Sequence, residues 1–175
     1  MSKNLVSIND LPPSGKEFVL DDQQIWLEPI KEFKMDCRVT DPLKMKVFVM
    51  PAEEGCLVRG ELKGAVVAPC NRCAEDAPIE IDVNFDEYEE TPNSPKERSE
   101  DSHIVFERNA PMLDLDAVAW EQLMLAIPPN PLCRPDCKGL CPDCGANLNV
   151  AACGCARDEG DPRMRVFRDL AEGKK

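Results

Sequence analysis

Cysteine is the residue type with the most distinctive chemistry in this chain of 175 residues, which contains ten of them. Cys70 and Cys73 form a C-x-x-C pair. A second group, near the C-terminal end, consists of Cys133, Cys137, Cys141, Cys144, Cys153 and Cys155. Closely spaced thiolates are typical ligands of structural zinc. The first twenty residues lack the basic start and apolar centre of a secretory signal, so we expect a reducing cytoplasm, where Zn²⁺ rather than disulfides would occupy the second group.

The most specific motif in that group is the run Cys141-Pro-Asp-Cys144-Gly145. Here two sulfurs come from one tight turn. Proline restricts one backbone angle, and glycine after the second cysteine permits a left-handed conformation. Backbone N–H groups in such a turn can point at the sulfurs and stabilise their negative charge. The motif therefore supplies half of a tetrahedral zinc site, and two further ligands are needed.

Three ligand sets satisfy the spacing. The first consists of Cys141, Cys144, Cys153 and Cys155. The second replaces one of the last pair with Cys137, because the two sulfurs of a C-x-C sequence tend to point apart. The third keeps the first set and adds a second site made of Cys70, Cys73, Cys133 and Cys137. All three sets stay open at the level of the sequence.

Catalytic readings of the chain have little support. A redox pair at Cys70 and Cys73 needs a helix N-terminus to lower a thiol pKa, whereas the flanking residues predict a turn between strands. His103 is the only histidine, and we expect it to be a structural or surface residue. No glycine-rich phosphate-binding motif is present. We therefore predict that the protein is not an enzyme, with a thiol oxidoreductase as the less favoured alternative.

The elements that would position these residues are mostly strands. Alternating apolar and polar residues predict strands at 44–50, 56–67 and 79–85. The last two would be antiparallel, with Cys70 and Cys73 in the turn between them. The apolar triplets at 18–20 and 25–27 flank polar residues and suggest a further hairpin. We expect four to six strands in all.

Helices are fewer. Residues 114–127 have apolar side chains at helical spacing, an aspartate at 114 or 116 as N-cap, and two prolines after the end. A short helix is also expected at 162–170. The predicted fold class is α+β, a mostly antiparallel β-sheet with one main helix and a small zinc-stabilised C-terminal element. The expected division is a β-rich domain at 1–130, with an acidic loop at 89–102, and a cysteine-rich tail at 131–175.

The formal net charge is −12, with 33 acidic and 21 basic residues. Residues 75–101 contain eleven acids and two bases, so most of the negative charge lies in one stretch. An acidic protein does not bind nucleic acid through overall charge, because that affinity comes from neutralising phosphates. The acidic stretch would suit a basic protein partner instead. No apolar run is long enough for a transmembrane helix, so no membrane association is expected.

Three segments resemble the bacterial YceD-like family, the large ribosomal RNA subunit accumulation proteins. Val67-Ala-Pro-Cys70-Asn-Arg-Cys73 resembles the family's V-x-x-x-C-x-R-C segment. Residues 114–133 resemble its helix and proline-rich exit. The sequence from Cys137 through Cys155 to Asp161-Pro-Arg163 is similar to the cysteine-rich tail of its longer branch. Together these similarities span roughly residues 15–172.

The resemblance implies a non-enzymatic role in 23S ribosomal RNA accumulation or processing and in large-subunit assembly. The implied partners are 23S ribosomal RNA, a large-subunit ribosomal protein, or both, with no small-molecule substrate. Direct RNA contacts would come from locally basic positions, namely Arg72, Lys44, Lys46, Arg163, Arg165 and Arg168. Some family members lack the tail cysteines, which implies that the tail site stabilises an appended element. The alternative is a zinc-dependent protein-interaction module unrelated to ribosomes.

Overall fold

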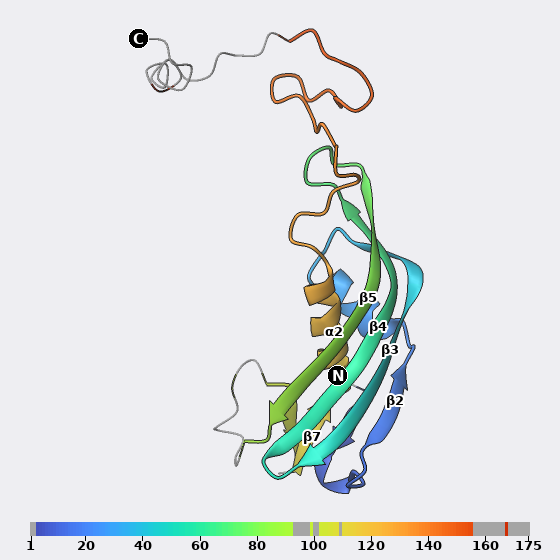
Figure 1. Ribbon diagram of the computed structural model, residues 1–175, viewed down its shortest axis with the longest axis vertical. Helices are drawn as coiled ribbons and strands as arrows, with labels where there is room; N and C mark the ends of the chain where they lie inside the picture. Colours follow the sequence, from blue (N-terminus) through green and yellow to red (C-terminus); the bar gives the residue numbers. More distant parts are fainter. Residues whose placement is uncertain (1–2, 93–98, 100–101, 109, 156–166, 168–175) are drawn as a thin grey trace.

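The computed structural model of the chain describes residues 3–92, 99, 102–108, 110–155 and 167 (Figure 1). Strands dominate, and two helices are present among these residues, which confirms the α+β class. The elements in chain order are β1 Leu5–Ser7, the 3₁₀ turn η1 Ile8–Asp10, β2 Lys16–Leu20, α1 Gln24–Glu32, β3 Arg38–Ala52, β4 Gly55–Pro69, β5 Asp76–Glu90, β6 Ile104–Glu107, β7 Ala110–Asp114 and α2 Leu115–Ala126. In the described part of the chain, no helix is long and apolar enough to cross a membrane.

The main sheet has the strand order β2-β3-β4-β5, and every neighbouring pair is antiparallel. The expected strands at 44–50, 56–67 and 79–85 lie inside β3, β4 and β5 and are confirmed. β4 and β5 form a long hairpin, paired in continuous register from Gly55 and Glu90 to Pro69 and Asp76. The turn at the end of this hairpin carries Cys70 and Cys73, as predicted.

One face of the main sheet forms the core. Alternate residues of β3 point inward, and Met45, Val47 and Val49 are at most 1% exposed. Figure 1 shows the long strands curving past α2 on this side. Trp26 of α1 is fully buried, and its indole Nε1 donates a hydrogen bond to the carbonyl oxygen of Ala119 in α2, at 3.2 Å. This contact fixes α1 against α2, so the helices cover the sheet as a pair.

The hairpin expected from the triplets at 18–20 and 25–27 is wrong, because the second triplet lies in α1. Trp26 and Ile30 are one helical turn apart and both are buried, whereas Glu28 between them is exposed; in a strand all three side chains would lie on the same face. The side-chain amide of Gln23 exchanges two hydrogen bonds with the backbone of Leu43, at 2.8 and 3.0 Å. The Gln23 side chain therefore takes the place of a strand partner for the N–H and carbonyl groups of Leu43, and the chain after β2 leaves the sheet to form α1.

The smaller sheet has the order β1-β7-β6 and leads directly into α2. The predicted helix at 114–127 is confirmed to within a residue at each end. The side chain of Asp114 accepts hydrogen bonds from the backbone N–H groups of Asp116 and Ala117, both at 3.1 Å, and so caps the helix. β5 continues to Glu90, two residues into the expected acidic loop, most of which lies outside the described residues, as does the helix expected at 162–170.

Candidate metal centre

Eight of the ten cysteines form two separate clusters. The sulfurs within each cluster all lie within 4.8 Å of one another. The inner cluster consists of Cys70, Cys73, Cys133 and Cys137, and the outer cluster of Cys141, Cys144, Cys153 and Cys155. This arrangement corresponds to the third of the ligand sets. The remaining two cysteines, Cys37 and Cys56, are buried in the core, as expected for small apolar residues.

The inner cluster has the dimensions of a tetrahedral zinc site. The sulfurs of Cys70 and Cys137 are 3.8 Å apart, and those of Cys73 and Cys133 are 3.6 Å apart. Four sulfurs each 2.3 Å from one zinc ion would be separated by about 3.8 Å. Three of the four residues are only 3% exposed, and with Ala77 they form a small core of their own at the hairpin tip. The residues therefore fit a closed structural metal site.

The outer cluster is more exposed. Only Cys141 is buried, whereas Cys144 and Cys155 are exposed. Cys153 and Cys155 both contribute their sulfurs to this cluster, so the geometry differs from the second ligand set, in which Cys137 replaces one of this pair. The outer site would therefore be more open to solvent than the inner one, although its four sulfurs also converge.

The two C-x-x-C turns have the same backbone structure. The N–H of Ala74 donates to the carbonyl of Cys70, and the N–H of Gly145 donates to that of Cys141, both at 2.9 Å. Each first cysteine also donates its N–H to the residue five positions later, at 2.7 and 2.8 Å. The residue after the second cysteine is left-handed in both turns, with φ of +59° at Ala74 and +72° at Gly145. Alanine in the usual glycine position hides this similarity in the sequence.

The segment after α2 is fastened to the hairpin tip by backbone contacts. The N–H of Asn71 donates to the carbonyl of Pro131, and the N–H of Leu140 donates to that of Arg72, both at 2.9 Å. The Arg72 guanidinium donates to the carbonyl of Cys137 at 2.8 Å. Gly139 lies so close that a Cβ there would come within 3.0 Å of the Arg72 carbonyl oxygen. Residues 131–140 therefore complete the inner cluster while lying against the β4–β5 turn.

Asn149 connects the two clusters. Its Nδ2 lies 3.3 Å from the sulfur of Cys137, and its Oδ1 accepts a hydrogen bond from the N–H of Lys138 at 2.8 Å. The chain between the clusters is held by a hydrogen bond from the N–H of Leu148 to the carbonyl of Gly139. The loop of the outer cluster thus contributes a donor to a sulfur of the inner one. Sequence reasoning did not single out Asn149, because an asparagine in a polar loop carries no distinctive signal.

The pKa values of the thiols differ within each cluster. Burial opposes ionisation of Cys70, but hydrogen bonds from the backbone N–H groups of Cys133, Arg72 and Cys73 outweigh it and lower its pKa to about 6. Burial and the neighbouring sulfurs raise the pKa of Cys133 to about 12. In the outer cluster, turn N–H groups lower the pKa of Cys141 to about 7, while hydrogen bonding to Cys144 and burial raise that of Cys155 to about 12. Each cluster therefore ionises fully only when a cation balances the accumulated charge.

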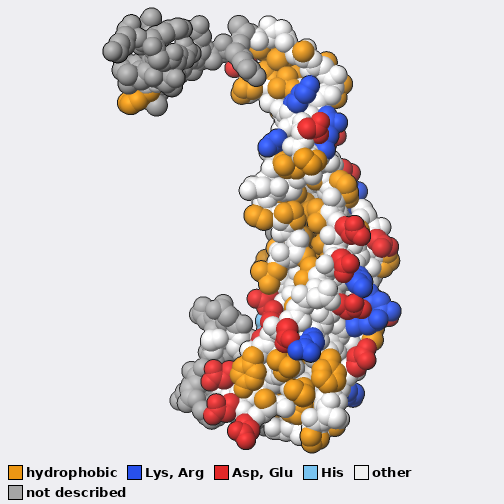
Figure 2. Space-filling model, in the orientation of Figure 1, with side chains coloured by type: hydrophobic (Ala, Val, Ile, Leu, Met, Phe, Trp, Pro, Cys, Tyr) orange, Lys and Arg blue, Asp and Glu red, His pale blue; other side chains and the backbone are white. Residues whose placement is uncertain are grey.

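The basic positions proposed for RNA contact are not gathered into one patch. Arg72 is exposed at the hairpin tip, whereas Lys44 and Lys46 lie on the outer face of β3. The Nζ of Lys46 is 3.3 Å from one carboxylate oxygen of Glu61, and the Nζ of Lys63 is 3.0 Å from the other. Figure 2 shows basic and acidic side chains interspersed along the molecule. The tail residues Arg163, Arg165 and Arg168 lie outside the described part of the chain.

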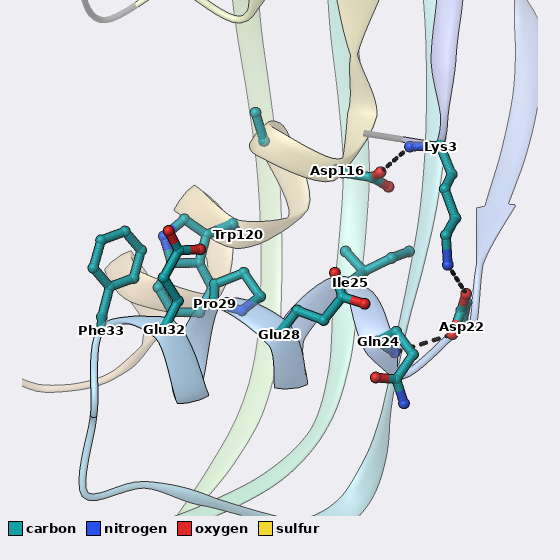
Figure 3. Close-up of a pocket in the computed structure, with 11 residues that line it drawn as sticks. Lys3, Asp22, Gln24, Ile25, Glu28, Pro29, Glu32, Phe33, Asp116 and Trp120 are labelled. Atoms are coloured by element: carbon teal, nitrogen blue, oxygen red, sulfur yellow. Dashed lines mark hydrogen bonds and ion pairs between the residues drawn. The ribbon is translucent and has the colours of Figure 1, made fainter. Parts of the chain in front are cut away.

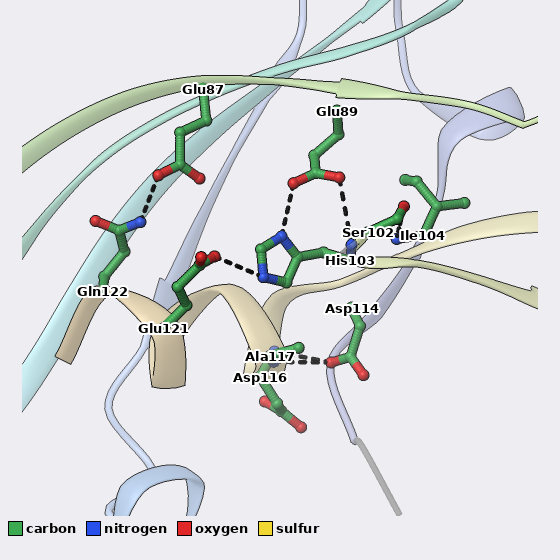
Figure 4. A network of polar contacts seen from close by, with 10 residues as sticks. All are labelled: Glu87, Glu89, Ser102, His103, Ile104, Asp114, Asp116, Ala117, Glu121 and Gln122. Atoms are coloured by element: carbon green, nitrogen blue, oxygen red, sulfur yellow. Dashed lines mark hydrogen bonds and ion pairs between the residues drawn. The ribbon is translucent and has the colours of Figure 1, made fainter. Parts of the chain in front are cut away.

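His103 is a structural residue, as expected. Its Nδ1 lies 2.6 Å from Glu89 of β5, and its Nε2 lies 2.8 Å from Glu121 of α2 (Figure 4). Burial disfavours a charge on the ring, but the hydrogen bond to Glu89 and the nearby carboxylates outweigh this effect and raise the pKa of His103. The imidazole ring therefore connects the C-terminal end of β5 to α2.

Relatives of the chain include bacterial and plant proteins. An uncharacterized protein of Mycobacterium tuberculosis is 31% identical over 128 residues, which cover 73% of this chain and 61% of the mycobacterial protein. An Arabidopsis thaliana protein named large ribosomal RNA subunit accumulation protein YCED homolog 1, chloroplastic, is 27% identical over 157 residues, covering 75% of this chain and 49% of the plant protein. A Zea mays protein of the same name is 28% identical, covering 55% of this chain and 42% of the maize protein. The matched regions thus span about two fifths to three fifths of these relatives.

The family match covers the elements described above. The sequence model of the family "Large ribosomal RNA subunit accumulation protein YceD" matches residues 58–171. This range begins in β4 and includes β5, α2 and all eight cysteines of the two clusters. No solved structure shows a significant match to the chain. Since the family match extends over more than half of the sequence, this chain belongs to the YceD family.

Proposed function

We propose that the protein supports the accumulation or processing of 23S ribosomal RNA, and with it the assembly of the large ribosomal subunit, without catalysing a reaction. The observation that carries the proposal is the family match over residues 58–171, together with plant relatives named as large ribosomal RNA subunit accumulation proteins. The protein would act by binding ribosomal RNA, a large-subunit ribosomal protein, or both. We expect this to take place in the cytoplasm of a bacterial cell.

We further propose that each cysteine cluster binds one Zn²⁺ ion. The all-sulfur ligand sets and the 3.6–3.8 Å sulfur separations in the inner cluster support zinc, which prefers tetrahedral thiolate coordination. When bound, the metal would supply the positive charge that lets four thiolates share one site. The inner site would fasten residues 131–140 to the hairpin tip, and the outer site would shape the loop that follows. Both roles are structural.

For RNA contact, the hairpin tip is the best-supported location. Arg72 is exposed there, and its guanidinium is oriented by the carbonyl of Cys137. Lys44 and Lys46 are weaker candidates, because Glu61 on β4 pairs with Lys46 and neutralises part of that face. The tail arginines at 163, 165 and 168 would follow directly after the outer cluster. Zinc binding would therefore order the neighbourhood of the proposed RNA contacts.

The second candidate function is a zinc-dependent protein-interaction module unrelated to ribosomes. The outer cluster favours it, since Leu140 and Val150 expose apolar side chains beside that cluster. A thiol oxidoreductase is less well supported. Cys70 and Cys73 are each only 3% exposed and lie against two further cysteines, whereas a catalytic dithiol must be reached by a substrate disulfide.

The test combines depletion with sedimentation. Depletion should lower the amount of 23S ribosomal RNA, and the tagged protein should co-sediment with precursors of the large subunit. Absence from every ribosomal fraction, together with normal 23S levels after depletion, would overturn the proposal. If the protein instead binds partners after RNase treatment and loss of ribosomal particles, the interaction-module alternative is favoured. Elemental analysis of protein purified without chelator should give about two zinc ions per chain.

A further inference from the structure

A pocket between α1 and α2 lies apart from both cysteine clusters. It has a volume of about 450 Å³, and its apolar lining consists of Ile25, Pro29, Ala117 and the rings of Phe33 and Trp120; all but Ala117 are labelled in Figure 3. Four carboxylates, one ammonium group and the side chain of Gln24 complete the lining. The pocket is therefore an apolar hollow with an acidic rim, and none of the clustered cysteines takes part in it.

The acidic groups of the rim fall into two kinds. Asp22 lies 3.7 Å from the Nζ of Lys3, and Asp116 accepts a hydrogen bond from the backbone N–H of Lys3 at 2.7 Å. Glu28 and Glu32 of α1 are exposed and have no ion pair with any described residue. The only cation of the pocket thus faces one end, and two carboxylates one helical turn apart stay available at the other.

An exposed aromatic pair lies beside these two carboxylates. The rings of Phe33 and Trp120 are stacked, with centroids 5.8 Å apart and planes 19° from parallel. Phe33 is 63% exposed, although it is one of the larger apolar side chains of the molecule. A cation over an aromatic face is stabilised by the ring quadrupole, and more so when carboxylates are close. Figure 3 shows Glu32 beside both rings and Glu28 farther along the same helix.

We propose that this pocket binds a basic, extended segment of a partner protein. An arginine or lysine side chain would lie over the Phe33 ring, and Glu28 and Glu32 would pair with it or with the next basic residue of the segment. The acidic rim suits a cationic polypeptide and repels the phosphates of RNA. The site goes beyond the proposed ribosomal function, since it would operate with any protein that has a suitable basic segment.

The experiment uses the full chain loaded with zinc and a fluorescein-labelled peptide of alternating arginine and glycine. Trp120 lines the pocket whereas Trp26 is fully buried, so the quenching of tryptophan fluorescence reports binding at this site. The Glu28→Gln/Glu32→Gln variant should weaken binding by about tenfold at low salt, where two charge-assisted contacts are lost. Phe33→Leu, which keeps an apolar side chain and removes the π face, should weaken it by about threefold.

The matched control is Glu53→Gln/Glu54→Gln, which removes the same charge from two exposed residues in the β3–β4 turn, outside the pocket. Unchanged affinity in this control, with weaker binding in the Glu28→Gln/Glu32→Gln variant, would support the pocket. Equal weakening in both would overturn it, because the peptide would then respond only to net charge. Unchanged affinity in the pocket variant, or tighter binding of a single-stranded RNA oligonucleotide than of the peptide, would also overturn it. A normal peptide result with no 23S phenotype would leave this site standing while the ribosomal function fails.

Discussion

Replacing Ala74 with glycine is expected to stabilise the protein, although it removes a side chain. Ala74 follows the second cysteine of the C-x-x-C turn at the hairpin tip and has a left-handed backbone, with φ of +59°. In the matching turn of the outer cluster, glycine occupies this position at φ +72°. The substitution therefore gives the inner turn the residue that its backbone conformation favours.

The magnitude follows from two opposing effects. The left-handed conformation costs an L-residue roughly 1–2 kcal/mol, and glycine removes this cost. Glycine also gains freedom in the unfolded chain, which offsets roughly 0.4–1 kcal/mol. The side chain of Ala74 is exposed, so little apolar burial is lost. The net expectation is a gain of about 0.5–1 kcal/mol in the free energy of unfolding.

The assay is urea unfolding of the zinc-loaded protein, followed by tryptophan fluorescence. With an m-value of about 2 kcal/mol/M, the midpoint should rise by roughly 0.3–0.5 M. The control is Ala117→Gly in α2, where the same chemical change should destabilise by about 0.5–1 kcal/mol because the helix needs no left-handed residue. The reciprocal variant Gly145→Ala should lose zinc more readily to a chelator. A Cβ at position 145 meets nothing within 4 Å, so the loss would reflect backbone strain alone.

A lower midpoint for Ala74→Gly, equal in size to that of Ala117→Gly, would refute the reasoning. It would mean that the turn does not hold position 74 in the left-handed conformation in solution. An unchanged chelator response in Gly145→Ala would count against the equivalence of the two turns. A rise in the urea midpoint of Ala74→Gly with an unchanged m-value would support the reasoning, since the change would then be in stability and not in the compactness of the unfolded chain.

Three further outcomes are expected. His103→Gln removes the ion pairs to Glu89 and Glu121, which raise the pKa of His103 in the folded state against the effect of burial. The stabilisation from these pairs is complete below about pH 6.5 and is lost as the pH rises through the folded pKa. The urea midpoints of variant and wild type should therefore converge with rising pH, and a difference independent of pH would contradict this. Asp114→Ala removes the α2 cap and should lower the free energy of unfolding by about 1 kcal/mol; thermal unfolding with no decrease would show that the cap is not formed in solution. Cys137→Ser should reduce bound zinc from about two ions per chain to about one, measured by elemental analysis; loss of both ions would show that the clusters are not independent.

The sequence alone was sufficient for the features that depend on local pattern. Period-two alternation identified the strands now seen as β3, β4 and β5, and the antiparallel turn with Cys70 and Cys73. An N-cap aspartate and a terminal proline pair identified α2 to within a residue at each end. The cysteine motifs and the segments flanking them identified the YceD family. In each case neighbouring residues carry the whole signal, because alternation, capping and turn geometry act over a few positions.

Other features depended on contacts between distant parts of the chain. The apolar triplet at 25–27 suits a strand locally, but the burial of Trp26 against Ala119 makes it helical. The pocket between α1 and α2 arises from the same packing and has no local signature. Neither could be read from spacing, because the partner residues lie about ninety positions away.

The assignment of the eight cysteines to two clusters likewise depended on contacts between distant parts of the chain. Spacing alone allowed three ligand sets, because a metal site requires only that four sulfurs converge. The tertiary structure brings Cys133 and Cys137 to the β4–β5 turn through the backbone contacts of Asn71 and Arg72, and so separates two clusters of four. The sequence determined that these residues are suited to bind metal, whereas the position of the hairpin tip relative to the end of α2 decided which of them meet.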